Sequence, residues 1–203
     1  MIAGRRLLVA TTNPGKLQEI RRALHGLSLE LLSLSDLPLI REPEETGLTF
    51  RENAAIKAEA YATASGLPTV AEDSGLAIDA LGGRPGVMSA RYPGSTYGEK
   101  FHNLYRELAG LPLPWTARFV CSLAFRDEPG ALALGHRFAA EGTVEGHIAA
   151  QPRGSHGFGY DPVFFYPPYD ATLGEVSDER KLAVSHRGAA FRQFRRWLED
   201  SGL

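Results

Sequence analysis

Apolar and polar positions along the chain form two kinds of pattern, which predict strands and amphipathic helices. Short apolar runs bounded by turn residues predict buried strands, and these runs are Leu7–Ala10, Leu29–Leu34, Thr69–Ala71, Leu76–Ala80, Arg118–Phe125, Leu132–Ala139 and Pro162–Phe165. Apolar residues recurring every three or four positions predict helices, and these segments are Pro14–Leu24, Phe50–Ala64, Glu99–Leu108 and His186–Leu198. The segment "RDEPGAL", residues 126–132, is typical of a hairpin turn. Because crossover helices occur together with hairpins, the pattern predicts an α/β fold with a mixed sheet.

Capping residues support two of the predicted helices. Asn13 can accept a hydrogen bond from the first helical turn, and Pro14 loses no hydrogen bond at the first helical position. Thr49 and Glu52 have the spacing of a capping box. Gly66 predicts the end of that second helix, since glycine adopts the left-handed conformation that closes a helix.

Composition and charge limit the classes of protein to which the chain can belong. Its 203 residues, 43% of them hydrophobic, predict one domain over residues 1–203 that needs no disulfide or metal to be stable. Cys121 is the only cysteine, so no internal disulfide can form. No apolar stretch approaches a membrane span and no signal-peptide pattern is present, so we expect a cytoplasmic protein with no membrane partner. The net charge of −2 argues against a general nucleic-acid binder, so any anion site must be local.

The segment "TTNPGK", residues 11–16, places a lysine where a helix disfavours it. Lys16 lies in the first turn of the predicted helix, where the helix dipole is positive. A phosphate bound at this helix N-terminus would make the lysine favourable, and Thr11 and Thr12 would add hydroxyl donors. The spacing is not that of a Walker loop. The alternative is an ordinary strand-to-helix turn with a solvated lysine.

Two acidic segments are candidates for a metal site. Glu44 and Glu45 precede the second predicted helix, on which Asn53 and Lys57 share one face. The segment "EDSG", residues 72–75, is expected to form the turn at the carboxyl end of a strand, a usual position for ligand-binding groups. Carboxylates with phosphate oxygens are the usual ligands of Mg²⁺. The alternatives are an acidic loop with a solvated helix face and a turn with no further role.

The last third of the chain carries aromatic, glycine and basic residues that fit a nucleobase. The segment 157–161, "GFGYD", combines glycines that allow close backbone approach with Phe158, which can stack on a base. Ser185 has the position of an N-cap, so His186 and Arg187 fall in the first turn of the last helix, and Lys181 lies upstream. The alternative is a glycine turn before a buried strand, with Phe158 in the core.

Six segments in this order resemble the inosine triphosphate pyrophosphatase family: "TTNPGK", "EETGLTFRENAAIKA", "EDSGLAIDALGG", "SARYPG", "GFGYDPVF" and "SHRG". The resemblance covers essentially the whole chain and implies an elongated mixed β-sheet flanked by helices, with two lobes and a central cleft. It implies a homodimer that hydrolyses non-canonical purine triphosphates (ITP, dITP and XTP) to the monophosphate and pyrophosphate. One departure is Glu72, where close relatives often carry Asp.

The resemblance also implies roles for particular residues. Asp73 would be the general base and, with Glu44, would bind Mg²⁺; whether Glu44 or Glu45 is the second ligand stays open. The implied substrate contacts are Thr11, Thr12, Asn13, Pro14, Gly15, Lys16, Lys57, Ser74, Phe158, Gly159, Tyr160, Asp161, Lys181, His186 and Arg187. The first-turn N–H groups of the last helix would donate hydrogen bonds to the 6-keto oxygen of a purine, and they would disfavour adenine, whose 6-amino group is itself a donor.

Two other functions are compatible with these segments. A Maf-like nucleotide pyrophosphatase would catalyse the same class of reaction on pyrimidine or modified triphosphates. A non-hydrolysing nucleotide sensor or RNA-binding module would need no general base, and "EDSG" would then have no catalytic role.

Overall fold

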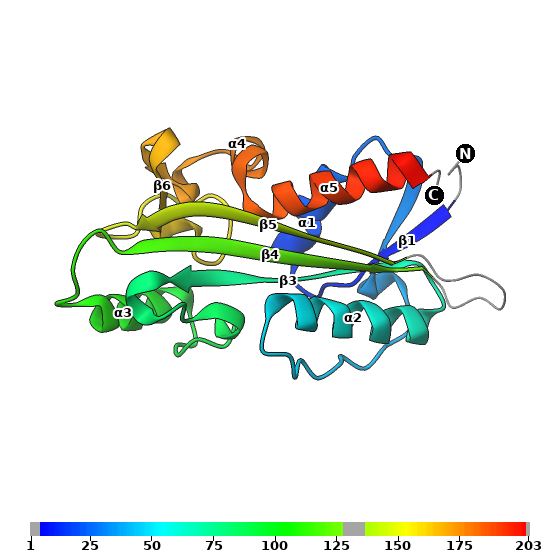
Figure 1. The fold of residues 1–203 in the computed structure, drawn as a ribbon, viewed down its shortest axis with the longest axis horizontal. Helices are drawn as coiled ribbons and strands as arrows, with labels where there is room; N and C mark the ends of the chain where they lie inside the picture. The colour runs from blue at the N-terminus through cyan, green and yellow to red at the C-terminus, as the bar shows by residue number, and fades with distance from the viewer. Residues whose placement is uncertain (1–4, 128–136, 202–203) are drawn as a thin grey trace. The chain divides into compact units, whose positions relative to one another are not determined.

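The computed structural model describes residues 5–127 and 137–201 (Figure 1). The strands are β1 (Arg5–Val9), β2 (Leu29–Ser33), β3 (Thr69–Ile78), β4 (Thr116–Arg126), β5 (Arg137–Ile148), β6 (Phe164–Tyr166) and β7 (Ala171–Thr172). The α-helices are α1 (Pro14–Ala23), α2 (Phe50–Ser65), α3 (Tyr97–Leu108), α4 (Asp178–Val184) and α5 (His186–Ser201). Within the described residues, none of these helices has the length and apolar character needed to cross a membrane.

The strands form one mixed sheet, as the sequence predicts. The order in the described residues is β2-β1-β3-β4-β5-β6-β7. β1 pairs in parallel with both β2 and β3, and Leu8 lies opposite Thr69 in the latter pair. β6 pairs antiparallel with both β5 and β7. Parallel strands joined by helices and antiparallel strands joined by short connections therefore occur in the same sheet, which confirms the predicted α/β class.

The chain divides into two compact units, and each contains its own apolar core. The first unit comprises residues 1–73, 121–142 and 187–203, and the second comprises residues 74–120 and 143–186. The chain passes between the units within β3, β4 and β5 and again at the start of α5. The two lobes and cleft implied by the resemblance stay a prediction.

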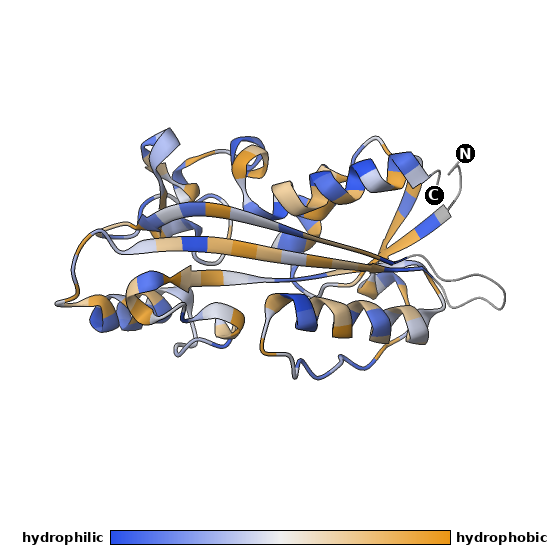
Figure 2. Ribbon diagram, viewed as in Figure 1, coloured by the Kyte–Doolittle hydropathy of each residue, from blue (hydrophilic) through white to orange (hydrophobic). Residues whose placement is uncertain are grey.

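In the first unit, helices cover both faces of the sheet (Figure 1). On one face Leu7 and Val9 of β1 belong to a buried cluster with Ile20 of α1 and Phe191 of α5. On the other face Leu8 belongs to a cluster built on the alanines of α2. This division follows from the alternation of side chains along a strand, and Figure 2 shows the matching stripes of apolar and polar residues on the helices.

In the second unit, α3 supplies one side of a separate core. Leu104 and Leu108 of α3 are fully buried in a cluster that includes Leu76 and Ile78 from β3. Phe164 of β6 is also fully buried there. The amphipathic pattern that predicts a helix over Glu99–Leu108 therefore reflects burial of one helix face against the strands.

The predicted turn at residues 72–75 is wrong, because β3 runs without a break from Thr69 to Ile78. Gly75 lies inside the strand. Glycine is needed at this position because a Cβ would overlap the Ser89 hydroxyl and the Gly86 carbonyl oxygen. Glu72 and Asp73 are buried in the strand rather than exposed in a turn. Buried carboxylates need compensating charges, and those charges are supplied by the helices described below.

The remaining boundaries mostly agree with the prediction. The Asn13 side chain accepts a hydrogen bond from the Lys16 N–H, the capping box of Thr49 and Glu52 forms, and Gly66 ends α2 in the left-handed conformation. The sequence pattern does not predict α4, a helix of only seven residues, or the full length of β5. Most of the predicted turn at 126–132 and the start of the predicted strand Leu132–Ala139 lie outside the described residues.

Candidate active site

β3 presents two adjacent carboxylates to opposite faces of the sheet in the first unit. Val70 packs in the cluster with α1 and α5, and Ala71 packs in the cluster with α2. Since side chains alternate along a strand, Glu72 shares a face with Val70 and Asp73 shares a face with Ala71. Two neighbouring acids therefore meet two different sets of helices and can do different chemistry.

Asp73 lies against the polar face of α2. Its Oδ1 is 3.1 Å from the Lys57 Nζ, and its Oδ2 accepts a hydrogen bond of 3.3 Å from the Asn53 amide. The Lys57 Nζ also lies 2.8 Å from Oε1 of Glu45. Asn53 and Lys57 therefore share a helix face as predicted. That face contacts both carboxylate oxygens of Asp73, and Lys57 also joins Asp73 to Glu45.

The surroundings of Asp73 favour a carboxylate that can accept a proton. Burial raises the pKa of Asp73, and the charge of Glu72 acts in the same direction, while Lys57 and Lys16 oppose the rise. Burial would lower the pKa of Lys57, but the charges of Asp73, Glu72 and Glu45 outweigh it and raise that pKa. Lys57 therefore stays cationic, and Asp73 is a stronger base than an exposed aspartate.

Glu72 lies in a buried charge cluster on the opposite face. Its Oε1 is 2.9 Å from the Lys16 Nζ and 3.2 Å from Nη2 of Arg187. Its Oε2 accepts a hydrogen bond of 3.4 Å from the Cys121 thiol. Nη1 of Arg187 also lies 2.5 Å from Oε2 of Glu19. Lys16 is therefore not the solvated lysine of the alternative interpretation, because it neutralises a buried acid.

This cluster keeps Glu72 ionised. Burial by itself would raise the pKa of Glu72, but the positive charges of Arg187, Lys16 and Lys57 hold the pKa well below its usual range. Burial raises the pKa of the Cys121 thiol, and the Glu72 charge raises it further. The thiol therefore stays protonated and donates its hydrogen bond to the carboxylate.

In the second unit, Asp161 joins two of the predicted base-binding residues. Its Oδ2 accepts a hydrogen bond of 2.7 Å from the Phe158 N–H and lies 2.5 Å from the Lys181 Nζ. The Lys181 ammonium lies 4.4 Å from the centre of the Phe158 ring, which is a cation–π contact. Gly157 has a φ of +70°, and a Cβ there would overlap the Asp161 carboxylate. Gly157 therefore allows the loop to pack directly against the Asp161 carboxylate.

The remaining predicted base-pocket residues are distributed over both units. Tyr160 is buried in the second unit and donates a hydrogen bond of 3.0 Å to the Ser89 carbonyl. His186, also in the second unit, stacks on Phe119 with ring centres 4.8 Å apart. Arg187 belongs to the first unit, where it joins Glu19 and Glu72. Glu19 and Cys121 are not predicted as members of this site from the sequence, since neither lies in a recognisable motif.

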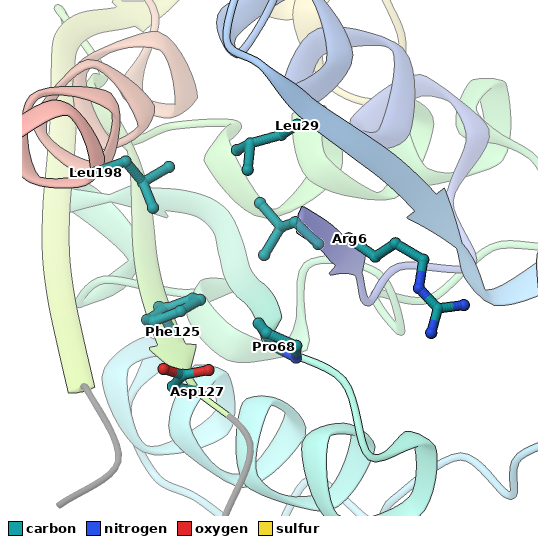
Figure 3. A pocket seen from close by; sticks show the side chains of 7 residues that line it. Arg6, Leu29, Pro68, Phe125, Asp127 and Leu198 are labelled. Carbon is teal, nitrogen blue, oxygen red and sulfur yellow. The ribbon is translucent and has the colours of Figure 1, made fainter. Parts of the chain in front are cut away.

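One small pocket in the first unit is not a candidate nucleotide site. It has a volume of about 20 Å³, enough for about one water molecule. Figure 3 shows its lining: Arg6, Leu29, Pro68, Phe125, Asp127 and Leu198 are labelled. None of the predicted site residues contributes to this lining.

The acidic residues near Lys57 fit a divalent cation that takes most of its ligands from a substrate. Within the described residues, no group of three or more His, Cys, Asp or Glu side chains could hold a metal ion. Asp73 and Glu45 both lie against the Lys57 ammonium, whereas the side chain of Glu44 is exposed. Mg²⁺ is commonly held by one or two carboxylates together with phosphates and water. Two neighbouring carboxylates are therefore a suitable protein contribution, and the position of Glu45 favours it over Glu44 as the second.

The fold and these charges define an α/β protein with buried, paired acidic and basic side chains on both faces of β3. A family model described as the Ham1 family matches residues 7–197. The dITP/XTP pyrophosphatase of Geobacter sulfurreducens is 47% identical over 201 residues, which are 98% of each chain. The dITP/XTP pyrophosphatase of Thermus thermophilus is 46% identical over 197 residues, which are 95% of this chain and 91% of the relative.

Solved structures agree with the sequence comparison. A HAM1 protein from Coxiella burnetii is 38% identical and gives a TM-score of 0.84 over 97% of this chain and 99% of that one. The Ham1 protein of Staphylococcus aureus is 34% identical, also with a TM-score of 0.84, over 97% of this chain and all of that one. This chain belongs to the Ham1 family.

Proposed function

We propose that this chain hydrolyses the non-canonical purine triphosphates ITP, dITP and XTP to the monophosphate and pyrophosphate, which removes them from the nucleotide pool. The observation that carries the proposal is the position of Asp73, a buried carboxylate of raised pKa held by Asn53 and Lys57. The resemblance to dITP/XTP pyrophosphatases over nearly the whole chain supports the choice of substrates. The homodimer and the cytoplasmic location stay predictions.

In the proposed mechanism, Asp73 takes the proton from a water molecule that attacks the α-phosphorus. A triphosphate carries about four negative charges, so an acidic protein needs local cations to bind it. Lys57 and Lys16 supply two of these, and the N-terminus of α1 supplies the positive end of a helix dipole. Mg²⁺, held by Asp73 and Glu45, would neutralise charge on the phosphoryl oxygens. Asn53 and Lys57 fix the Asp73 carboxylate so that its proton-accepting oxygen keeps one orientation.

Removal of divalent metal is expected to abolish hydrolysis. With excess EDTA, dITP hydrolysis should fall to background, because Lys16 and Lys57 alone leave roughly half of the triphosphate charge unneutralised. Addition of Mg²⁺ beyond the chelator should restore the rate. The measurement is pyrophosphate release under the three conditions. Activity that persists in EDTA would remove Glu45 and Asp73, as well as Glu44, from the proposed metal roles.

The base is expected to be selected by its 6-position, with Phe158 stacking on the ring. Hypoxanthine and xanthine present a 6-keto acceptor to the N–H donors in the first turn of α5, whereas adenine presents an amino donor. A buried donor left unpaired in this way can reduce kcat/KM by up to ~10⁴-fold. A steady-state panel should therefore rank ITP, dITP and XTP far above ATP.

The same panel separates the competing functions when UTP and dTTP are included. Preference for a pyrimidine triphosphate would favour a Maf-like pyrophosphatase, and binding without turnover would favour a nucleotide sensor. Equal kcat/KM for ITP and ATP would contradict the explanation of base choice while leaving pyrophosphatase activity intact.

A further inference from the structure

Lys16 has a carboxylate partner at the place where the proposed function needs a free cation. Its ammonium lies 2.9 Å from Glu72, and the two side chains differ in exposure, 18% for Lys16 and 0% for Glu72. A ligand can therefore approach the Lys16 side chain from its solvent-exposed side, while the glutamate stays in the core. A triphosphate that recruits Lys16 must weaken this ion pair or replace it.

The rest of the cluster is arranged so that Glu72 survives the loss of Lys16. Arg187, whose side chain is 2% exposed, contacts both Glu72 and Glu19. The Cys121 thiol bonds to the second oxygen of Glu72. If Lys16 moves to a phosphate, Glu72 still has Arg187 as a buried cationic partner and the Cys121 thiol as a hydrogen-bond donor. The core therefore never holds an uncompensated carboxylate.

We propose that Glu72 is a positioning residue that holds Lys16 in the free protein and competes with the triphosphate for it. Polyphosphate binding then exchanges one ion pair for another: the Lys16 ammonium passes from the Glu72 carboxylate to a phosphate oxygen. This inference rests on the proposed function, since it takes Lys16 as a phosphate-binding residue. The Glu72 contact also explains how the protein tolerates Lys16 in the first turn of α1 before ligand binding, when no phosphate compensates the unfavourable interaction of the lysine with the helix dipole.

Glu72 can affect triphosphate binding in two opposite ways: it competes with the anion for Lys16, and it orders the Lys16 side chain. The competition is expected to be the larger effect. The Lys16 side chain is already largely enclosed, so removal of the Glu72 charge frees little rotamer entropy. A negative charge in contact with the ammonium, in contrast, directly opposes the approach of an anion. Loss of the Glu72 charge is therefore expected to strengthen polyphosphate binding, on the order of tenfold for one charge-assisted contact no longer given up.

The test measures binding of inorganic triphosphate to the full chain by calorimetry, with EDTA present and no nucleotide. Glu72→Gln keeps the size of the side chain and should bind triphosphate about tenfold more tightly than the wild type. Glu72→Asp keeps a negative charge in the cluster but shortens the side chain, which draws the carboxylate away from both Lys16 and Arg187, since the two cations contact the same oxygen. About threefold tighter binding is expected. If Glu72→Gln does not fold, Glu72→Asp alone decides the question.

Two further variants separate competition for Lys16 from a general change of charge. Glu19→Gln removes the other acid bound to Arg187, and its triphosphate affinity should stay within about twofold of the wild type. In a Lys16→Ala background, Glu72→Gln should no longer improve binding. A purely structural role for Glu72 would lower the melting temperature of the Glu72 variants without tightening binding.

Unchanged or weaker binding by the Glu72 variants, or equal gains in Glu19→Gln or in the Lys16→Ala background, would overturn the proposal. Failure of the proposed function is a distinct result. In that case the wild type would not hydrolyse dITP or XTP with Mg²⁺, whatever the triphosphate affinities of the variants.

Discussion

Replacement of Asp73 by asparagine is expected to lower kcat for dITP by ~10²–10⁴-fold, the usual contribution of a general base. The change keeps the size of the side chain and an oxygen that can face Asn53 or Lys57. It removes the proton acceptor and one negative charge from the proposed metal site. KM should change much less than kcat, because Lys16, Lys57 and the base-binding residues are untouched.

The pH dependence gives this prediction a second readout. Asp73 must be ionised to act, and its pKa is raised above the ordinary value of 3.8. The wild-type kcat should therefore fall as the pH drops through that raised pKa, and the residual rate of Asp73→Asn should lack this fall. Asp170→Asn is the matched control, since Asp170 is exposed at a φ of +49°, a conformation that asparagine adopts readily. Turnover by Asp73→Asn within a few-fold of the wild type would exclude Asp73 as the base.

Replacement of Arg187 by alanine is expected to cost about 3–5 kcal/mol of folding free energy, the usual effect of breaking a buried ion pair. The guanidinium contacts Glu19 and Glu72, and its loss leaves both carboxylates in the core with less compensating charge. Urea unfolding followed by circular dichroism measures the effect. The kcat/KM for ITP should also fall, measured at a temperature where the variant is folded.

Arg195→Ala is the matched control on the same helix. Arg195 is partly exposed to solvent, pairs with Glu199 one turn later at 3.0 Å and donates a hydrogen bond of 2.7 Å to the His25 carbonyl oxygen. These surface contacts together contribute about 1–2 kcal/mol, so the variant should lose clearly less stability than Arg187→Ala and keep its kcat/KM. A loss below about 1 kcal/mol in Arg187→Ala would contradict the cluster as the reason for the burial of Arg187.

Local chemistry explains why part of the candidate site was predictable. Asn13 and the capping box at Thr49 act within one helical turn, so residue type and spacing are enough to place the starts of α1 and α2. The same applies to Asn53 and Lys57, which share a face of α2 by helical periodicity alone. These contacts do not depend on how distant parts of the chain pack.

Long-range pairing explains what the sequence analysis could not predict. The segment at residues 72–75 has the composition of a turn, but it lies inside β3, where Glu72 and Asp73 are paired with cations from other elements. Arg187 lies 115 positions after Glu72, and it lies 168 positions after Glu19. No local sequence pattern predicts such a cluster. The turn propensity of "EDSG" is therefore the only signal in the sequence, and tertiary contacts override it.

Water is expected to attack the α-phosphorus of a non-canonical purine triphosphate on this chain. Hydrolysis of dITP with Mg²⁺ in ¹⁸O-labelled water, followed by mass spectrometry of the products, shows which phosphorus is attacked. One ¹⁸O atom is expected in the monophosphate and none in the pyrophosphate. Label in pyrophosphate, release of orthophosphate as the first product, or no hydrolysis would contradict it.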